Sequence, residues 1–183
     1  LMKKAFFTSV LLLTSSLGFA STWSVYEVQV KQSDAPAVAA ALDKFMKSDV
    51  AKSMPGGVHL NATLFGGTNN ATHAFVLLFS DLATQLEWQA SVPTTEAGQE
   101  FGAAMDVLAT PVASYTNSLI KVWGTPSNSD RFHQVTRFYT TDPLAVLAAQ
   151  EKLMSDPSMA NFPGQVGLSQ TAIGNRLGAN GAS

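Results

Sequence analysis

The side chains best suited to proton transfer or ligand binding lie on two stretches that alternate as β-strands. The first stretch places Glu27 and Gln29 on one face, and the second places His59 and Asn61 on one face. An imidazole within hydrogen-bond reach of a carboxylate or a carboxamide can act as a general base with an orienting partner. We therefore predict that His59 acts as a general base and that Glu27 or Asn61 orients it, on the condition that their strands are adjacent.

Other kinds of chemistry find little support in the composition. The three histidines His59, His73 and His133 have no spacing that places two of them on one helix face or close together along one strand. We therefore expect no metal site and no cofactor. The chain has no cysteine, which excludes a thiolate nucleophile and a disulfide framework. A net charge of −2 without a basic run argues against a nucleic-acid partner.

The elements that position these side chains follow the order β-α-β-β-α-β. Apolar residues recur at helical spacing after Asp34, and Pro93 interrupts a second helical region at residues 92–95. This order is that of the split β-α-β unit of ferredoxin-like folds, in which both helices cover one face of the sheet. The predicted strands and helical regions are 23–31 (strand), 34–46 (helix), 58–65 (strand), 72–79 (strand), 81–109 (helical) and 115–123 (strand).

Alternation also predicts which side chains point at the helices. These are Tyr26, Val28, Val30, Val58 and Leu60. The opposite, polar set then lines the face that the helices leave free, and a polar surface of this kind suits a small ligand with hydrogen-bonding groups. A polar face without a ligand remains the alternative.

The chain also shows an internal repeat with an offset of 108 residues, the separation of Pro55 and Pro163. Without a gap, the same offset aligns Asp34 with Asp142. It places His133 and Arg137 on the first strand of a second copy, facing the same way as Glu27 and Gln29. The aligned residues outside these positions include Lys44 with Lys152, Met46 with Met154 and Gly66 with Gly174.

The repeat divides the chain into parts. We predict a signal peptide at 1–20, a first ferredoxin-like repeat at 21–124, a linker at 125–130 and a partial second repeat at 131–183. Ser183 aligns with a residue inside the third strand of the first copy. We expect either that the sequence belongs to a longer reading frame or that a half module is completed by self-association, which would cover the open sheet face.

The first twenty residues have the three parts of an export signal. Lys3 and Lys4 precede the apolar run 5–13, and small residues occupy positions 18 and 20. We therefore predict cleavage after Ala20 and a periplasmic or secreted location. A buried N-terminal helix is the alternative. No later stretch approaches the roughly 18 apolar residues of a membrane helix, so we expect no membrane association after cleavage.

The two Pro-Gly hairpin starts and residues 86–91 on the second helical region make the chain resemble the dimeric α+β barrel superfamily, in particular its exported tandem-repeat members. That superfamily includes antibiotic-biosynthesis and haem-degrading monooxygenases. The resemblance implies a pseudo-dimeric barrel of two ferredoxin-like repeats. It also implies that Trp88 lies beside a substrate, although a tryptophan on such a helix also suits core packing. Glu27 and Gln29 stand where the haem-degrading members use an asparagine, a departure from the pattern.

Two classes of function remain. The first is an exported small-molecule-binding or interaction module, and the second is a cofactor-independent monooxygenase-like enzyme that acts on a small aromatic substrate inside the barrel. The candidate ligand-binding residues for both are Glu27, Gln29, His59, Asn61, Trp88, His133 and Arg137. The expected partners are a small molecule and, to cover the open face, a second copy of the chain.

Overall fold

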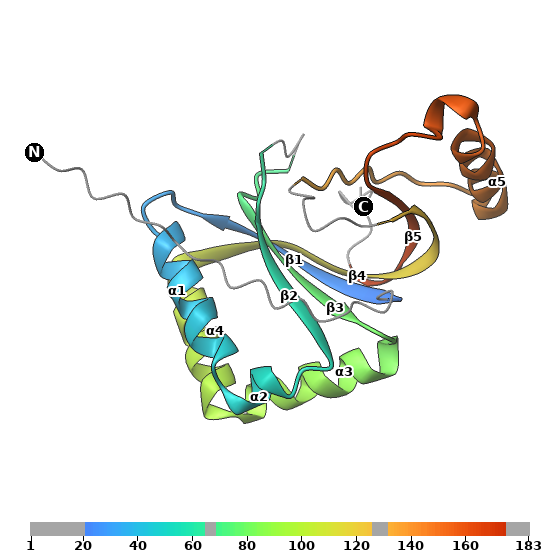
Figure 1. Cartoon of the computed structure of the whole chain (residues 1–183). Helices are drawn as coiled ribbons and strands as arrows, with labels where there is room; N and C mark the ends of the chain where they lie inside the picture. The colour runs from blue at the N-terminus through green and yellow to red at the C-terminus, as the bar shows by residue number, and fades with distance from the viewer. Residues whose placement is uncertain (1–20, 65–68, 126–131, 175–183) are drawn as a thin grey trace, which may run out of the picture.

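A computed structural model describes residues 21–64, 69–125 and 132–174, which form a mixed α+β fold around one antiparallel sheet (Figure 1). The five strands lie in the order β2-β3-β1-β4-β5. The elements are β1 (Thr22–Val30), α1 (Ala35–Met46), α2 (Asp49–Lys52), β2 (Gly56–Ala62), β3 (His73–Phe79), α3 (Leu82–Ser91), the 3-10 turn η1 (Val92–Thr94), α4 (Glu96–Leu108), β4 (Ala109–Gly124), α5 (Pro143–Met154), the 3-10 turn η2 (Pro157–Met159) and β5 (Gln165–Gly174).

The first four strands confirm the order expected for a split β-α-β unit, since β1 and β2 are separated by β3 and β4 lies on the other side of β1. The predicted break in the second helical region is also confirmed. Pro93 sits in η1, and the Thr95 hydroxyl accepts a hydrogen bond from the Gly98 N–H to start α4. The turn between β2 and β3 includes residues 65–68, which lie outside the described residues.

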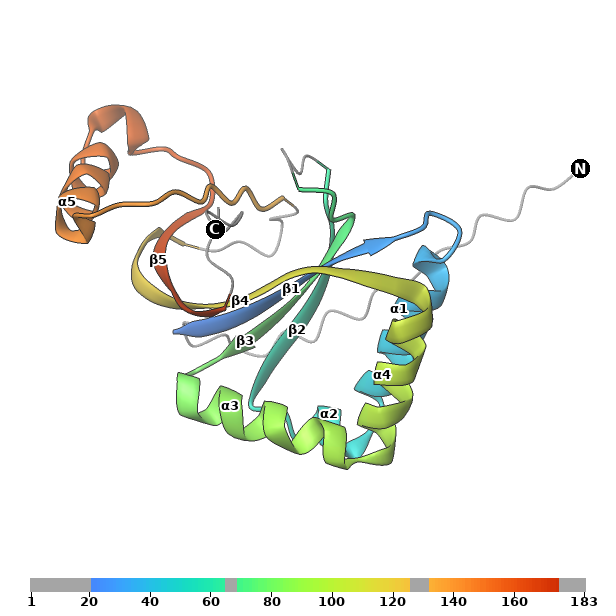
Figure 2. The same cartoon turned by 180° about the vertical axis from the view of Figure 1, so that it is seen from behind.

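Helices α1, α3 and α4 cover one face of the sheet (Figures 1 and 2). Val28 and Val30 of β1 pack there with Val38 of α1, which is fully buried. Val58 and Leu60 of β2 are partly buried against the same layer. The predicted inward face is therefore confirmed. Burying these side chains supplies most of the free energy that holds the helices on the sheet.

Strand β4 is long and carries the curvature of the sheet. Its ladder with β1 shifts register between Glu27 and Val28, opposite Pro111, which has no N–H to donate. Its ladder with β5 shifts register twice. Each such bulge bends the strand and increases its twist. As a result β4 and β5 curve toward the side of the sheet that the helices leave free (Figure 1).

The C-terminal part of the chain only partly follows the predicted second copy. At the offset of 108 residues, α5 corresponds to α1 and β5 corresponds to β2. The prediction of a strand that carries His133 and Arg137 is wrong, because residues 132–140 form no strand. In the first copy, the equivalent strand β1 is held between β3 and β4. The counterpart of β3 would begin at residue 181, outside the described residues, and none of the described strands pairs with residues 132–140.

Residues 132–140 instead run across the free face of the sheet as an irregular segment, which we call the strap (Figures 1 and 2). The described strands leave β2 and β5 as the two edges of an open sheet. Of the predicted segments, 1–20 lies outside the described residues, as does most of the linker 125–130. None of the described helices is both long and apolar enough to cross a membrane.

Candidate functional site

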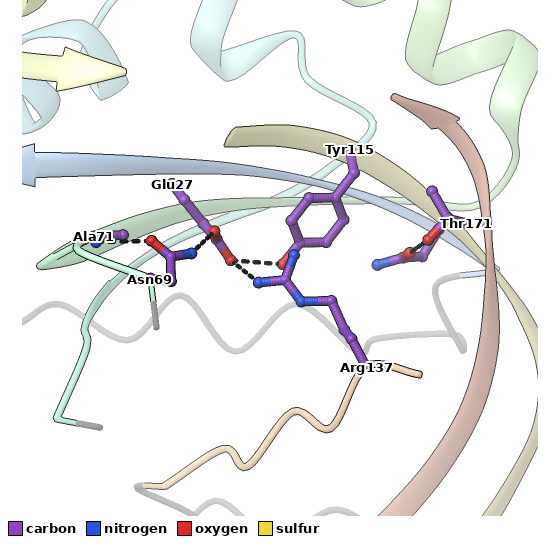
Figure 3. Close-up of polar contacts among 7 residues, drawn as sticks. Glu27, Asn69, Ala71, Tyr115, Arg137 and Thr171 are labelled. Atoms are coloured by element: carbon purple, nitrogen blue, oxygen red, sulfur yellow. Dashed lines mark hydrogen bonds and ion pairs between the residues drawn. The ribbon is translucent and has the colours of Figure 1, made fainter. Parts of the chain in front are cut away.

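The candidate site is centred on the carboxylate of Glu27, which lies on the free face of the sheet but is only 8% exposed. Its Oε1 accepts hydrogen bonds from the Tyr115 hydroxyl at 3.0 Å and from Arg137 Nη2 at 2.5 Å. Its Oε2 accepts a hydrogen bond from the Asn69 side-chain amide. Three donors from three separate segments therefore converge on one carboxylate (Figure 3). A buried carboxylate requires such partners, because water no longer solvates it.

Arg137 and Tyr115 form a second contact beyond their shared carboxylate. The guanidinium carbon of Arg137 lies 4.5 Å from the centroid of the Tyr115 ring, a cation–π geometry. Removal from water is the main cause that raises the pKa of Tyr115, and the negative charge of Glu27 raises it further. The phenol therefore stays protonated and acts as a hydrogen-bond donor. Arg137 thereby connects the strap to the sheet through an ion pair and a stacked ring.

The backbone around Glu27 explains how this geometry is held. The register shift at Pro111 lies directly opposite Glu27 and Val28. Bulges of this kind reorient neighbouring side chains and recur beside functional sites. On the other side, the Asn69 side-chain oxygen accepts from the Ala71 N–H at 2.8 Å, which fixes the amide that donates to Glu27. Both features hold the carboxylate in place before any ligand arrives.

His59 lies nearby on β2, where its side chain remains exposed. Partial removal from water lowers its pKa, and the positive charge of His133 lowers it further. The charge effect requires the strap residue His133 to lie close to β2. The strap therefore carries two chemically active groups over the sheet, an imidazole near His59 and a guanidinium on Glu27.

The predicted pairing of His59 with Glu27 is wrong. Their strands are not adjacent, because β3 lies between β2 and β1. Two strand spacings amount to about 10 Å, which is beyond hydrogen-bond reach. Asn61 shares a cross-strand row with Ala74 and Glu27, but it too is two strands away from the carboxylate. Among the described residues no hydrogen bond joins Asn61 to His59.

The remaining predicted residues lie elsewhere. Gln29 is exposed, and the structure gives it no side-chain hydrogen bond to another described residue. Trp88 is on the helix-covered side, buried against Phe45 and Phe79, and its indole N–H donates to the carbonyl of Val50 at 3.0 Å. The core-packing interpretation of Trp88 therefore fits its position. Of the seven predicted residues, the structure joins Glu27 directly to Arg137 alone.

Sequence reasoning missed two members of the site, Tyr115 and Asn69. Tyr115 begins the predicted fourth strand, and the pairing of Val25 with Tyr115 places it on the free face. The sequence offered a signal, since β4 neighbours β1 in the split β-α-β order. Asn69 lay in a predicted turn, where nothing in the sequence indicates a contact with β1.

In the described ranges, no three His, Asp or Glu side chains are grouped so that they could hold a metal ion. The groups that the structure gathers at the site are a fixed carboxylate, a stacked guanidinium, a phenol that donates and two imidazoles. These groups can bind and orient a polar molecule.

The ion pair of Glu27 predicts a stability effect. Glu27→Gln removes the charge that compensates Arg137 on a nearly buried face, and we expect it to lower the free energy of unfolding by about 1–3 kcal/mol. Urea denaturation measures this change. The matched control is Glu100→Gln, which removes an exposed ion pair with Lys44 and should leave the urea midpoint unchanged. Equal shifts in the two variants would contradict the prediction.

The proximity of His133 leads us to predict how the pKa of His59 changes. In the folded protein His59 should titrate below its usual value of about 6.5. Because the folded state favours the neutral ring, this contribution to stability is fully present above pH ~6.5 and is lost as the pH falls below that value through the lower pKa of the folded state. NMR titration of His133→Ala should show the His59 pKa rising, whereas the neighbouring exposed change Gln134→Ala should not move it. Identical curves in both variants would place the strap away from β2.

No family model matches the chain, and no curated protein matches its sequence. Among solved structures, the chain is similar to a protein from Agrobacterium tumefaciens whose crystal structure was determined by a structural genomics consortium. The two are 14% identical, and the match covers 61% of this chain and 99% of that chain with a TM-score of 0.43. A likeness at this level carries no argument about the site.

Proposed function

We propose that the protein is a small-molecule-binding module whose ligand lies on the free face of the sheet, beneath the strap. The observation that carries this proposal is the convergence of Asn69, Tyr115 and Arg137 on the nearly buried carboxylate of Glu27. A polar centre of this kind, organised on a rigid sheet and closed by one irregular segment, is a common way to build a small ligand site.

The donors of Arg137 indicate the ligand class. A guanidinium has five N–H donors, of which the ion pair with Glu27 uses one. The Arg137 side chain is 28% exposed, so a ligand can reach it. Beside it lie the Tyr115 ring and the apolar side chain of Val25, which is paired with Tyr115 across the sheet. The site therefore suits a small amphipathic molecule with an apolar or aromatic body and an anionic group.

The enzyme alternative, a cofactor-independent monooxygenase, receives less support from the geometry. The candidate general base His59 is separated by strand β3 from Glu27, which was expected to orient it. Trp88 is packed in the helix layer on the opposite face. A binding module needs no general base. We therefore favour binding over catalysis for this face.

The proposed binding module is also compatible with the expected barrel of two ferredoxin-like repeats. The segment that aligns with β2, namely β5, extends the sheet beyond β4 and curves over the free face. We propose that further strands, from a second repeat or from a second copy of the chain, would extend this curve into the pseudo-dimeric barrel. The ligand site would then lie in its interior.

Sodium benzoate and benzamide test the proposed site, because they share a ring and differ in charge. We expect benzoate to bind about tenfold more tightly than benzamide, owing to its charge-assisted hydrogen bonds with Arg137. Arg137→Gln should remove this preference, as measured by isothermal titration calorimetry. Lys121→Gln, which changes an exposed cation paired with Glu151, is the control and should have no effect. A preference for benzoate that survives Arg137→Gln would refute the proposed site.

We also propose that the protein acts after export. Strand β1 begins at Thr22, so cleavage after Ala20 would remove none of the described elements. The full chain expressed in a Gram-negative bacterium should yield a periplasmic protein. Its intact mass, measured by mass spectrometry, should be that of a chain that begins at Ser21. Ala20→Leu puts a large side chain at the cleavage position and should leave the precursor uncut, whereas Ala5→Leu within the apolar run should not. Recovery of the uncleaved chain from the cytoplasm would show the export proposal to be wrong.

A further inference from the structure

The helix-covered face of the sheet is apolar at one end and polar at the other. Beneath α1 and α4 it consists of residues such as Val28, Val30 and Phe75. Beneath α3 the same face changes character, because Ser24 pairs with Thr116 and Tyr26 pairs with Ser114 across β1 and β4. A covered face is expected to be apolar. Ser24 and Thr116 are buried, whereas Tyr26 and Ser114 are exposed, so the two buried hydroxyl groups call for a reason.

Helix α3 packs on this polar patch with glutamine side chains, whose amides form hydrogen bonds with it. The Gln85 side chain is fully buried and donates to Ser24 and, at 3.3 Å, to Thr116, while these two hydroxyls lie 2.6 Å apart. One helical turn further on, Gln89 donates to the Tyr26 hydroxyl at 2.9 Å. The result is a connected network of neutral hydrogen-bonding groups between a helix and the sheet.

This network is incomplete within the described residues. The side-chain oxygen of Gln85 is buried and has no hydrogen-bond partner there. Exchanging the two ends of the amide would not resolve this, because its nitrogen would then be the unpartnered atom. A buried polar atom without a partner is costly, so a donor from outside the described protein groups would stabilise this position.

A cavity of about 150 Å³ adjoins the network. Its wall includes the polar residues Ser24, Tyr26, Gln89, Ser114 and Thr116, together with Leu86, Tyr115 and Ile173. At the average volume of liquid water this space holds about five water molecules. Gly174 closes one side, where its backbone φ of 110° and its approach to the Ser114 carbonyl leave no room for a side chain.

The wall of this cavity carries no charged side chain. Removal from water raises the pKa of Tyr26, so its hydroxyl stays neutral. The groups on offer are hydroxyls, which both donate and accept, and amides, which do the same at their two ends. A charged ligand would lose its hydration here without gaining an opposite charge. A molecule that presents several hydroxyl groups would match the polar part of this wall, which includes Ser24 and Thr116, the two hydroxyl partners of Gln85.

We infer that this cavity is a second ligand site, on the opposite face of the sheet from Glu27, and that it takes a neutral polyol. Three features carry the inference together, namely the polar patch on a covered face, the unpartnered amide atom of Gln85 and the uncharged cavity beside it. The sites are chemically distinct, since one is charged and the other neutral.

Erythritol tests this inference, with butyrate and butylammonium as charged molecules of the same carbon number. In NMR titrations of the full chain, erythritol should shift the side-chain amide signals of Gln85 and Gln89, and the charged molecules should not. Tyr26→Phe and Gln89→Leu each remove one hydrogen-bonding group from the wall and should each weaken erythritol binding about two- to tenfold. Both side chains are partly exposed, so the variants should fold, which thermal melts verify.

Two control variants show whether erythritol binds at this cavity. Gln99→Leu makes the same change on an exposed part of α4 and should leave erythritol binding unchanged. Lys121→Gln, which lies outside the wall, should also leave it unchanged. Erythritol binding is measured at Gln85 and Gln89 and benzoate binding at Arg137, so failure of this site is distinct from failure of the site at Glu27. Equal binding of erythritol and the charged molecules would overturn the inference. The inference would also be overturned if one water molecule is bound to the Gln85 side-chain oxygen and erythritol does not displace it.

Discussion

Helices α1, α3 and α4 cover one face of the sheet, and this constraint decides what each strand residue can do. Along β1, alternate side chains either enter the helix-packed layer or face the open side. Val28 and Val30 take the first role and hold α1 on the sheet, while Glu27 takes the second and is left with no helix to bury it. The open face therefore has to supply its own partners for this carboxylate, whose neighbours on the same face of β1 are Val25 and Gln29.

The strap supplies the strongest of those partners. Arg137 crosses from an irregular segment and binds both the Glu27 carboxylate and the Tyr115 ring, so an ion pair and a cation–π contact act at one point. The strap is neither helix nor strand, and this contact joins it to β1 and β4.

The two faces of the sheet thus carry two kinds of polar chemistry. The open face gathers charged groups around Glu27, and the covered face gathers neutral amides and hydroxyls around Gln85. Tyr26 and Glu27 are adjacent in sequence, yet they belong to different sites because successive side chains of a strand point in opposite directions. The bulge beside Pro111 and the close approach at Gly174 shape these sites from the backbone side.

The sequence by itself determined most of the local structure of the first copy. Period-two and helical spacings located β1 to β3, the second half of β4, and the helices α1, α3 and α4, and Pro93 marked the break before α4, because these features depend on neighbours in the chain. The short helix α2 and the first part of β4, residues 109–114, were not predicted. Only the tertiary structure decided the sites. The separation of His59 from Glu27 depends on β3 lying between their strands. The partnership of Glu27 with Tyr115 and Asn69, and the burial of Gln85 against Ser24, join residues far apart in the chain. The irregular course of residues 132–140 had the same origin. Their pattern suits a strand, but a strand forms only where neighbouring strands offer their backbone hydrogen bonds.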